Sequence, residues 1–592
     1  MARRASPRPR RRTRHQGPIC LRLAFSLRRL RGTCRTHEDH ACARPFWKSL
    51  MTTTAVQALA KWFPEITAFR DRQESVIDRL LGDQSALLLM PTGAGKTLTY
   101  QLPVLEKGGI SLVISPLIAL MREQAEKLTK RGIAAIALGG LEPAEAQAVL
   151  ARFTWESGAG FLFTSPERLE TDGFLEYLLS ARRQRIVQVT IDEAHCISQW
   201  GHDFRPAYKA LPRFLDRVFG PSGWPPRLCL TATLDPPSEE EVRTDFRLQP
   251  SDVVRSDHML RANLDLSYET YDHTDTKLAA LDDLLEEHRG EKIIVYAHLK
   301  QNKRGGTRTI AERLRAKGHK AEAFDADLPL SERDRVASSF KSGKSLIVCA
   351  TGAFGMGIDI PDIRGVVHLI PPESFEQYYQ EVGRAGRDGK PAFAKFLYFS
   401  KNGEVRREMI EAGLTTSDAV MASWSDLMES CGRNDLKLID PQMAFDGKDY
   451  NYALFHAFQR LGAVDVVARG PMRLDVYEPK GPDGLQLINR LRDNTKTGNF
   501  LAAFRKLSLD PADGYRRVFE LQLSGQLKLV RSPGNCLIFR TADLTDVQAD
   551  QIASDINRKV EKRLKEFDSF RAVIETGKDI EKVLARKFAS LS

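Results

Sequence analysis

The 592-residue sequence contains no run of about 18 apolar residues free of charge, which is the length that a membrane-spanning helix requires. We therefore expect no association with a membrane. Its eight cysteines are scattered, and none belongs to a CxxC pair. This excludes an obvious disulfide framework or Cys-rich zinc site and favours a reducing compartment. The composition is 42% hydrophobic and 28% charged, which excludes a wholly disordered chain, and the length suggests about four domains.

The net charge of +11 indicates an acidic partner such as nucleic acid, but it is unevenly distributed. Residues 1–50 hold 14 basic and 2 acidic side chains, a net of +12. The other 542 residues therefore carry −1 in total. Residues 441–592 contain 25 basic and 20 acidic side chains, a net of +5, which leaves −6 for residues 51–440. Overall charge is thus no argument for nucleic-acid binding by the folded part.

Residues 1–50 are a basic leader that we expect to be disordered and that has three interpretations. It is a nucleic-acid-binding arm, an organelle transit peptide, or translated upstream sequence with Met51 as the true start. We favour the third, because the sequence from Met51 reads as an amphipathic beginning. The expected location is then the cytoplasm, in association with the nucleoid, with organelle targeting by residues 1–50 as the alternative.

Between about residues 60 and 400, short apolar runs alternate with amphipathic stretches, a pattern typical of buried parallel strands joined by helices. The predicted strands are 86–90, 110–115, 160–164 and 186–191, then 292–296, 320–324, 346–349, 365–369 and 394–399. The two series are joined near residues 255–275. They predict an α/β protein with two doubly wound parallel-sheet domains.

The last third has a different pattern and predicts a smaller α+β region. A helix at 450–461 precedes strands at 464–468 and 473–478, with a turn at Gly470-Pro471 between them. The same outline recurs at 514–525, 527–531 and 536–541, with a turn at Pro533-Gly534. Helix, strand, turn and strand form the outline of a winged helix. A final helical stripe from Ile552 to Phe567 is expected to pack on its own domain.

A phosphate-binding loop is predicted where the strand at 86–90 runs into PTGAGKT. A glycine-rich turn between a strand and a helix lets backbone N–H groups approach phosphate oxygens. Lys96 would then reach the β- and γ-phosphates, and the Thr97 hydroxyl would bind Mg²⁺. The strict pattern asks for glycine where Met90 stands, but the shorter GxGKT core is typical of helicase-type ATPases.

The tetrapeptide DEAH follows the apolar strand at 186–191, about 100 residues after this loop. Asp192 is predicted to bind Mg²⁺ through water, and Glu193 to activate the attacking water. His195 is predicted to link the site to the parts that move.

These motifs resemble those of superfamily 2 helicases, and the longer stretch DEAHCISQWGHDFRPAY at 192–208 resembles RecQ-type DNA helicases. Further matching segments are FRDRQ at 69–73, VISPLIALMREQ at 113–124, TSPERL at 164–169, TAT at 231–233, ATGAFGMGIDIPDIRGVVH at 350–368 and YYQEVGRAGRDG at 378–389. The resemblance covers about residues 60–400. It implies two tandem RecA-like domains, 51–260 and 261–400, followed by 401–592 as a helical linker, a winged-helix-like DNA-binding region and terminal helices.

The resemblance also implies roles for individual residues. Arg70 and Gln73 are expected to contact the adenine, and residues 92–97 (Thr92, Gly93, Ala94, Gly95, Lys96, Thr97) the phosphates. Gln380 would position the attacking water, Arg384 and Arg387 would act as arginine fingers, and Asp359 would contact ribose or relay domain closure. Trp200, Phe204 and Arg205 are expected to sense single-stranded DNA, because aromatic faces stack on bases without reading sequence. The implied ligands are ATP and Mg²⁺, with single-stranded and tailed duplex DNA as partners and a monomeric state.

The sequence departs from the family after the motor. RecQ proteins commonly carry a four-cysteine zinc platform there, whereas Cys431 stands alone, so we expect no zinc and a buried role for Cys431. The segment FDADL at 324–328 replaces a His-containing segment. The tips at 469–473 and 531–535 are the candidate strand-separating wedges. We therefore predict a 3′→5′ DNA helicase in repair, recombination or defence, with a DNA-stimulated translocase with little unwinding, or an RNA helicase, as the alternatives. The presence together of Lys96, Thr97, Asp192, Glu193, Arg384 and Arg387 argues against a fourth interpretation, a non-catalytic scaffold.

Overall fold

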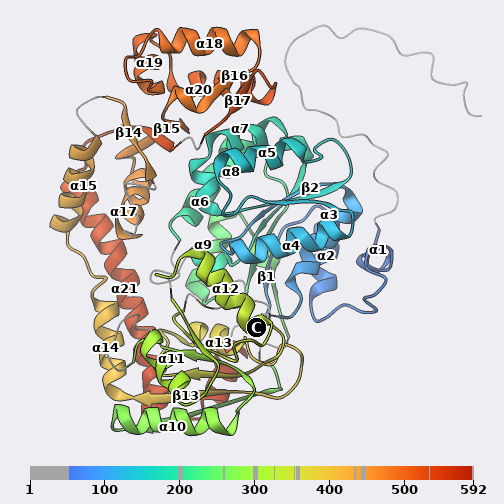
Figure 1. The fold of residues 1–592 in the computed structure, drawn as a ribbon, viewed down its shortest axis with the longest axis vertical. Coiled ribbons are helices and arrows are strands. Elements are labelled where there is room, and N and C mark those ends of the chain that lie inside the picture. Colours follow the sequence, from blue (N-terminus) through green and yellow to red (C-terminus); the bar gives the residue numbers. More distant parts are fainter. Residues whose placement is uncertain are drawn as a thin grey trace, which may run out of the picture. The chain divides into compact units, whose positions relative to one another are not determined.

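The structure is a computed structural model. It describes residues 53–589 except 92, 198–204, 258–259, 298–304, 326, 353, 355–359, 432–434, 442–448 and 532–533. Two parallel sheets and a mixed C-terminal region make up this part of the chain (Figure 1). None of its helices is long and apolar enough to cross a membrane.

The first sheet has seven strands in the order β3-β4-β2-β5-β6-β1-β7, all paired in parallel. They are β1 Ala86–Leu89, β2 Gly109–Ile114, β3 Ala134–Ala137, β4 Ala159–Thr164, β5 Ile186–Ile191, β6 Arg227–Thr231 and β7 Val253–Arg255. The helices with them are α1 Ala55–Trp62, α2 Gln73–Leu81, α3 Lys96–Lys107, α4 Ile118–Lys130, α5 Pro143–Arg152, α6 Pro166–Thr171, α7 Gly173–Ala181, α8 Ala207–Phe219 and α9 Pro236–Asp245. The predicted strands are confirmed to within one residue at each end.

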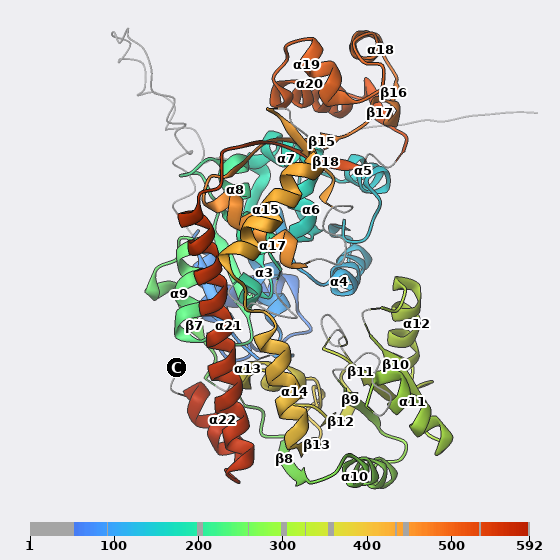
Figure 2. The ribbon, with the colours of Figure 1, turned by 90° about the vertical axis from the view of Figure 1, so that its left-hand side faces the viewer.

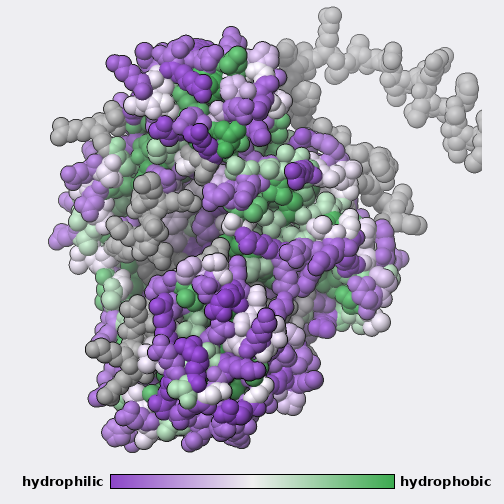
Figure 3. All heavy atoms as spheres, viewed as in Figure 1, coloured by the Kyte–Doolittle hydropathy of each residue, from purple (hydrophilic) through white to green (hydrophobic). Residues whose placement is uncertain are grey.

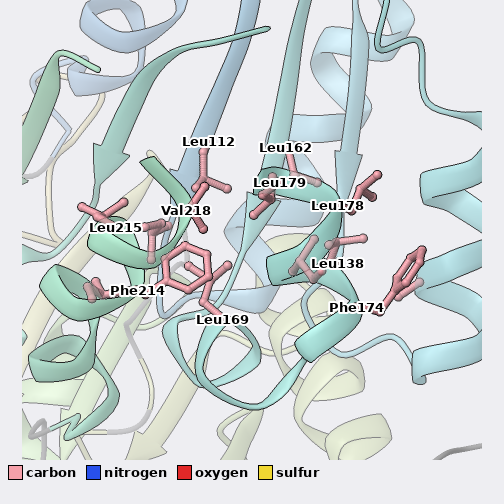
Figure 4. Packing of buried hydrophobic residues seen from close by; sticks show 14 of the residues in the cluster. Leu112, Leu138, Leu162, Leu169, Phe174, Leu178, Leu179, Phe214, Leu215 and Val218 are labelled. Atoms are coloured by element: carbon pink, nitrogen blue, oxygen red, sulfur yellow. The ribbon is translucent and has the colours of Figure 1, made fainter. Parts of the chain in front are cut away.

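One face of this sheet is covered by helices α6, α7 and α8. Leu112 of β2 and Leu162 of β4 meet Leu179 of α7 and Leu215 of α8 in a continuous hydrophobic cluster (Figure 4). A second cluster, with side chains from α1, α2, α3 and α4, covers the other face. Because both faces are covered, the strands are largely apolar, which is why the sequence reveals several of them as apolar runs.

The second sheet has six strands in the order β10-β11-β9-β12-β13-β8, again all parallel. They are β8 Leu264–Tyr271, β9 Lys292–Tyr296, β10 Ala321–Phe324, β11 Ile347–Ala350, β12 Ile363–His368 and β13 Ala392–Phe399. Its helices are α10 Thr274–Glu287, α11 Thr307–Ala316, α12 Leu330–Lys341 and α13 Phe375–Val382. Two RecA-like domains of the α/β class are thereby confirmed.

The C-terminal region is built from helices and two small antiparallel sheets (Figure 2). Its helices are α14 Ser400–Glu411, α15 Ser417–Cys431, α17 Asp449–Arg460, α18 Pro482–Arg492, α19 Phe500–Lys506, α20 Pro511–Leu523, α21 Asp546–Glu575 and α22 Ile580–Ala589. Its strands are β14 Lys437–Ile439, β15 Val464–Pro471, β16 Tyr477–Pro479, β17 Leu527–Leu529 and β18 Asn535–Thr541.

The two predicted hairpins of this region are wrong. Strand β15 continues through Gly470 and Pro471 instead of turning there, and it pairs with β18. Strand β16 pairs with β17. Each of the two predicted helix–strand–turn–strand units therefore contributes one strand to each observed strand pair. Helices α18, α19 and α20 lie between β16 and β17 in the sequence. Gly470 and Pro471 predict a turn, but β15 instead pairs with β18, about 70 residues away, and no local sequence pattern reveals that pairing.

Few large hydrophobic side chains of the described residues are exposed. The face shown in Figure 3 is mostly hydrophilic. Among the described residues, the exposed large hydrophobic side chains are spread over several elements: Val56, Val405, Met409, Leu414, Leu485, Leu523, Val530 and Val547.

Candidate ATP and nucleic-acid site

The loop between β1 and α3 has the backbone that phosphate binding requires. Gly93 and Gly95 have φ values of +80° and +90°, a region that side chains with a Cβ rarely occupy. A Cβ at Gly95 would also lie 2.7 Å from Nε2 of Gln73. Helix α3 begins at Lys96 and Thr97 follows in its first turn, so both predicted phosphate and metal contacts lie at a helix N-terminus.

The Lys96 ammonium group is buried and has no hydrogen-bond partner among the described residues. A buried cation without a hydrogen-bond acceptor is costly unless an anion is to be bound there. This loop therefore fits a nucleotide phosphate, because the Lys96 side chain directly follows the glycine turn of Gly93 and Gly95.

Asp192 lies directly beyond the carboxyl end of β5, where its backbone N–H donates to Ile114 O at 2.8 Å. The Ser115 hydroxyl donates to its carboxylate at 3.1 Å. Burial, with a smaller contribution from Glu193, raises the pKa of Asp192 to about 6, against the opposing effects of Lys96 and Ser115. A carboxylate destabilised in this way gains from a bound cation, so Asp192 fits the predicted Mg²⁺ site.

Glu193 and His195 connect the DEAH segment to the TAT segment at 231–233. The His195 Nδ1 atom lies 3.3 Å from a Glu193 carboxylate oxygen and 3.0 Å from the Thr231 hydroxyl, which donates to Thr233 O. Glu193 has a φ of +50°, a strained conformation for a residue with a Cβ. The buried imidazole thus contacts both segments, as the predicted linking role requires.

The structure places Gln73 on the phosphate loop. Its Nε2 donates to Ala94 O at 3.2 Å and to Gly95 O at 2.9 Å, while its Oε1 accepts from Arg70 N at 2.8 Å. The amide is thus engaged on both sides by protein groups. Its predicted contact with adenine stays a prediction.

Gln380, Arg384 and Arg387 lie on or just after α13 of the second domain, and Arg387 reaches the first. A Cβ placed on Gly93 would lie 3.3 Å from Cγ of Arg387. Gln380 Nε2 is buried and has no hydrogen-bond partner among the described residues. Arg387 therefore lies beside the phosphate loop, whereas the predicted roles of Gln380 and Arg384 stay predictions.

Arg261 was missed by sequence reasoning and supports this arginine segment. It lies between the two sheets in the sequence, and its guanidinium group donates to Gly383 O at 2.6 Å and to Ala385 O at 2.8 Å. Burial and the neighbouring Arg387 lower its pKa. No motif marks a residue that acts through backbone carbonyls, so only the structure reveals it.

Four of the predicted site residues, Thr92, Trp200, Phe204 and Asp359, lie outside the described residues. Arg205 is described, and its guanidinium donates to Glu167 at 3.0 Å. Glu167 belongs to the TSPERL segment and lies in the first turn of α6. Arg205, which follows the aromatic-rich loop, is thus bound to α6 by a salt bridge.

The opposite end of α6 binds the C-terminal region through a buried polar cluster centred on Glu170. The Glu170 carboxylate is paired with His456 at 3.2 Å and accepts from the Tyr452 hydroxyl, and Arg469 Nε donates to the Glu170 carbonyl at 2.7 Å. Arg469 lies at one predicted wedge tip, but its side chain is only 9% exposed. The wedge hypothesis is therefore wrong for Arg469, which anchors the region to the first domain.

The described residues contain no group of three or more His, Cys, Asp or Glu side chains placed to hold a metal ion. Cys431 is half-buried, not buried as predicted, and burial raises the pKa of its thiol.

Comparison with known proteins agrees with this geometry. Residues 70–242 match the DEAD/DEAH box helicase family, and residues 276–389 match the helicase conserved C-terminal domain. The "Probable ATP-dependent DNA helicase RecS" of Bacillus subtilis is 32% identical over 411 residues, which is 69% of this chain and 80% of that protein. The chain belongs to the RecQ family. Its segments at 69–73, 192–208 and 378–389 can accordingly be treated as RecQ motifs.

Other RecQ relatives are longer than this chain. The ATP-dependent DNA helicase RecQ of Pasteurella multocida is 37% identical over 61% of this chain, and the match spans 55% of that protein. The hus2/rqh1 helicase of Schizosaccharomyces pombe is 36% identical over 59% of this chain, which is 26% of that protein. The chain thus spans about half or less of these two relatives.

Among solved structures, the DEAD-box helicase Mss116 bound to ssRNA shares 17% identity, with a TM-score of 0.49, over 59% of this chain and 73% of that chain. The Mycobacterium smegmatis helicase Lhr bound to ssDNA shares 21% identity, with a TM-score of 0.46, over 68% of this chain and 56% of that chain.

Proposed function

We propose that this RecQ-family chain is an ATP-dependent 3′→5′ DNA helicase that couples ATP hydrolysis to movement along single-stranded DNA and to unwinding of tailed duplexes. The observation that carries the ATPase part is the buried Lys96 ammonium, which directly follows the glycine turn, acts electrostatically on Asp192 and has no hydrogen-bond partner among the residues that the structure describes. The direction of movement and the choice of DNA come from membership of the family.

Each described residue has a task that follows from its position. Lys96 and the loop N–H groups bind the phosphates, and Thr97 and Asp192 would hold Mg²⁺, which would neutralise charge on the phosphate oxygens. Glu193 accepts the proton of the attacking water. Arg384 and Arg387 bring positive charge to the transferred phosphoryl group from the second domain.

Hydrolysis then depends on how the two domains face each other, because Lys96 and Arg387 belong to different domains. His195 connects Glu193 to Thr231, so a shift of the TAT segment changes the position of the base. We propose that Arg205, with Trp200 and Phe204, reports bound DNA to this site through the contact with Glu167 on α6.

A second function, DNA-stimulated translocation with little unwinding, is favoured by one observation. The two predicted wedge hairpins do not form, and Arg469 of the first tip is buried against the motor. If neither tip separates strands, the chain moves along DNA with little unwinding.

One experiment distinguishes these functions. ATPase rates are measured with single-stranded DNA, duplex DNA and RNA, and unwinding is measured on 3′- and 5′-tailed duplexes. The helicase proposal predicts stimulation by single-stranded DNA and unwinding from the 3′ tail only. Stimulation without unwinding supports the translocase, and stimulation by RNA alone contradicts both.

A further inference from the structure

The C-terminal region is joined to both RecA-like domains through hydrophobic cores. On the first domain, Phe174 and Tyr177 of α7 contact Phe519 of α20, with ring centroids 5.9 and 6.1 Å apart. On the second domain, Phe570 of α21 contacts Phe375 and Tyr378 of α13 at 5.1 and 5.6 Å. The region therefore bridges the two halves of the motor.

Helix α21 is the rigid part of this bridge. It has 30 residues, about 45 Å at 1.5 Å per residue. From Ala549 to Phe567 it packs with α15 and α17 in one cluster, and from Phe570 to Ile574 it is part of the core of the second domain. A helix embedded at both ends transmits displacement instead of absorbing it.

Two consecutive residues in the middle of α21 contact different domains. Lys562 Nζ lies 2.5 Å from an Asp235 carboxylate oxygen and 3.3 Å from the Ser238 hydroxyl, both on the first domain. Arg563 donates to Glu373 of the second domain at 2.6 and 3.2 Å. One turn of one helix thus contacts both domains.

These contact points lie next to the ATPase motifs. Asp235 caps the N-terminus of α9 two residues after Thr233, the end of the TAT segment. Glu373 immediately precedes Ser374, the cap of α13, which leads to Gln380, Arg384 and Arg387. Displacement of α21 at this turn would therefore reach segments on both sides of the nucleotide site.

We propose that α21 is a strut that sets the separation of the two domains, with Lys562 and Arg563 as positioning residues for ATP hydrolysis. This rests on the proposed ATPase function. The two contacts differ in strength. Arg563 and Glu373 are 16% and 19% exposed and are joined by the buried Arg406, whereas Lys562 is 40% exposed. Arg563 therefore holds α21 on the second domain, and Lys562 releases the first domain when the motor opens.

The test measures domain separation directly, in the chain without nucleotide. Spin labels are placed at Glu156 in the first domain and Glu286 in the second, which are 74% and 61% exposed, after Cys431 and the three cysteines of residues 1–50 are changed to Ser. Lys562→Met is expected to broaden the distance distribution, and Lys562→Arg to preserve it. The matched control Lys565→Met, at an exposed position three residues away, is expected to leave it unchanged.

A double-mutant cycle isolates the contact, because Asp235→Asn removes the charge but keeps a good helix cap. Lys562→Met with Asp235→Asn is expected to broaden the distribution no more than either single change. In DNA-stimulated ATPase assays, each single change is expected to lower kcat at least threefold, with the KM for ATP within twofold. Arg563→Met is expected to lower kcat further.

A distance distribution in Lys562→Met identical to that of the unmodified chain would overturn the strut, as would fully additive effects in the cycle. If the unmodified chain shows no DNA-stimulated hydrolysis, the proposed function fails. The distance measurement needs neither ATP nor DNA and still decides whether α21 sets domain separation.

Discussion

At the scale of single residues, the phosphate loop and the DEAH segment form a site in which the described protein groups do not fully stabilise the charges of Lys96 and Asp192. The Lys96 ammonium has no hydrogen-bond acceptor within the part of the chain that the structure describes, and burial of Asp192 disfavours its charged form. Both costs are reduced when a phosphate and a divalent cation bind together. The folded chain therefore favours binding of the nucleotide and metal as a pair.

Substitution of Lys96 or Glu193 tests this site. Lys96→Ala is expected to abolish both nucleotide binding and hydrolysis, because the phosphate loses its buried cation. Glu193→Gln is expected to keep binding but to lower hydrolysis at least about a hundredfold, through loss of the base. Binding of a fluorescent ATP analogue separates the two variants, and hydrolysis near the normal rate in Glu193→Gln would remove that residue from catalysis.

The arginine segment gives a second prediction. Arg387→Ala is expected to lower kcat by roughly a thousandfold with little change in ATP binding, because a finger acts on the charge that develops in the transition state. Arg261→Ala, which removes the guanidinium that donates to the carbonyls of Gly383 and Ala385, is expected to lower kcat by a smaller factor. A lower affinity for ATP with unchanged kcat in Arg387→Ala would be the opposite outcome.

How much of this site the sequence predicts depends on how local each signal is. Lys96, Asp192 and Glu193 are found from short motifs at the ends of apolar strands, because parallel strands bring their carboxyl ends to one edge. Arg261 and the contact between Gln73 and the phosphate loop are not found, since backbone carbonyls carry no residue signature. Strands β3 and β8 are also not predicted from the sequence. Strand β3 is mostly alanine, a weak strand former, and β8 is an edge strand with many polar residues.

At the scale of elements, α6 joins the motor to the C-terminal region by a buried polar cluster. Burial alone would raise the pKa of Glu170, but His456, Tyr452 and Arg469 together lower it. A lowered pKa means that this carboxylate stabilises the fold above its unfolded pKa of about 4.5 and that the stabilisation is lost as pH falls through the folded value. The cluster thus fixes the region on the motor at neutral pH.

Glu170→Gln is therefore expected to lower the free energy of unfolding by about 3 kcal/mol at pH 7, because it removes the buried negative charge that His456, Tyr452 and Arg469 stabilise. The difference is expected to begin to shrink as the pH falls below 4.5, where the unfolded chain takes up a proton, and to vanish as the pH falls through the lower folded pKa, where the carboxylate of the unmodified chain is itself protonated. Urea unfolding at both pH values measures this. Arg473→Ala, which changes an exposed arginine four residues after Arg469, is the control and should have little effect.

Helix α21 carries a second titrating group, Glu566, whose pKa is shifted in the opposite direction to that of Glu170. Burial, followed by Glu376 and Asp235, raises the pKa of Glu566 from 4.5 to about 7, while Lys562 and Lys587 oppose the shift. A raised carboxyl pKa means that the folded state holds its proton more tightly than the unfolded state. Stability therefore decreases as pH rises from 4.5 to about 7, and the cost is complete above that pH.

Glu566→Gln mimics the protonated form and is expected to stabilise the chain at pH 8 by about 1 kcal/mol, a value reduced for partial exposure. At pH 5 it is expected to have little effect. Calorimetric Tm values at the two pH values give the comparison. Equal changes at pH 5 and pH 8 would show that charge at Glu566 does not matter.

At the scale of the whole molecule, the region after residue 400 packs on both RecA-like domains and connects them. The α18–α20 insertion packs on the first domain, and α21 and α22 belong to the core of the second. The sequence predicts that this region is α+β, but not its strand pairing, because β15 with β18 and β16 with β17 are contacts between distant segments. The predicted wedge was assigned from local turn signals and failed for this reason.

The central claim is that the two RecA-like domains form one DNA-stimulated ATPase that separates strands. The most direct measurement is unwinding of 3′- and 5′-tailed duplexes with ATP, with Glu193→Gln as the inactive control. The account predicts ATP-dependent unwinding of the 3′-tailed duplex, none of the 5′-tailed duplex, and none by the control. Unwinding of the 5′-tailed duplex alone, or equal activity in Glu193→Gln, would contradict it.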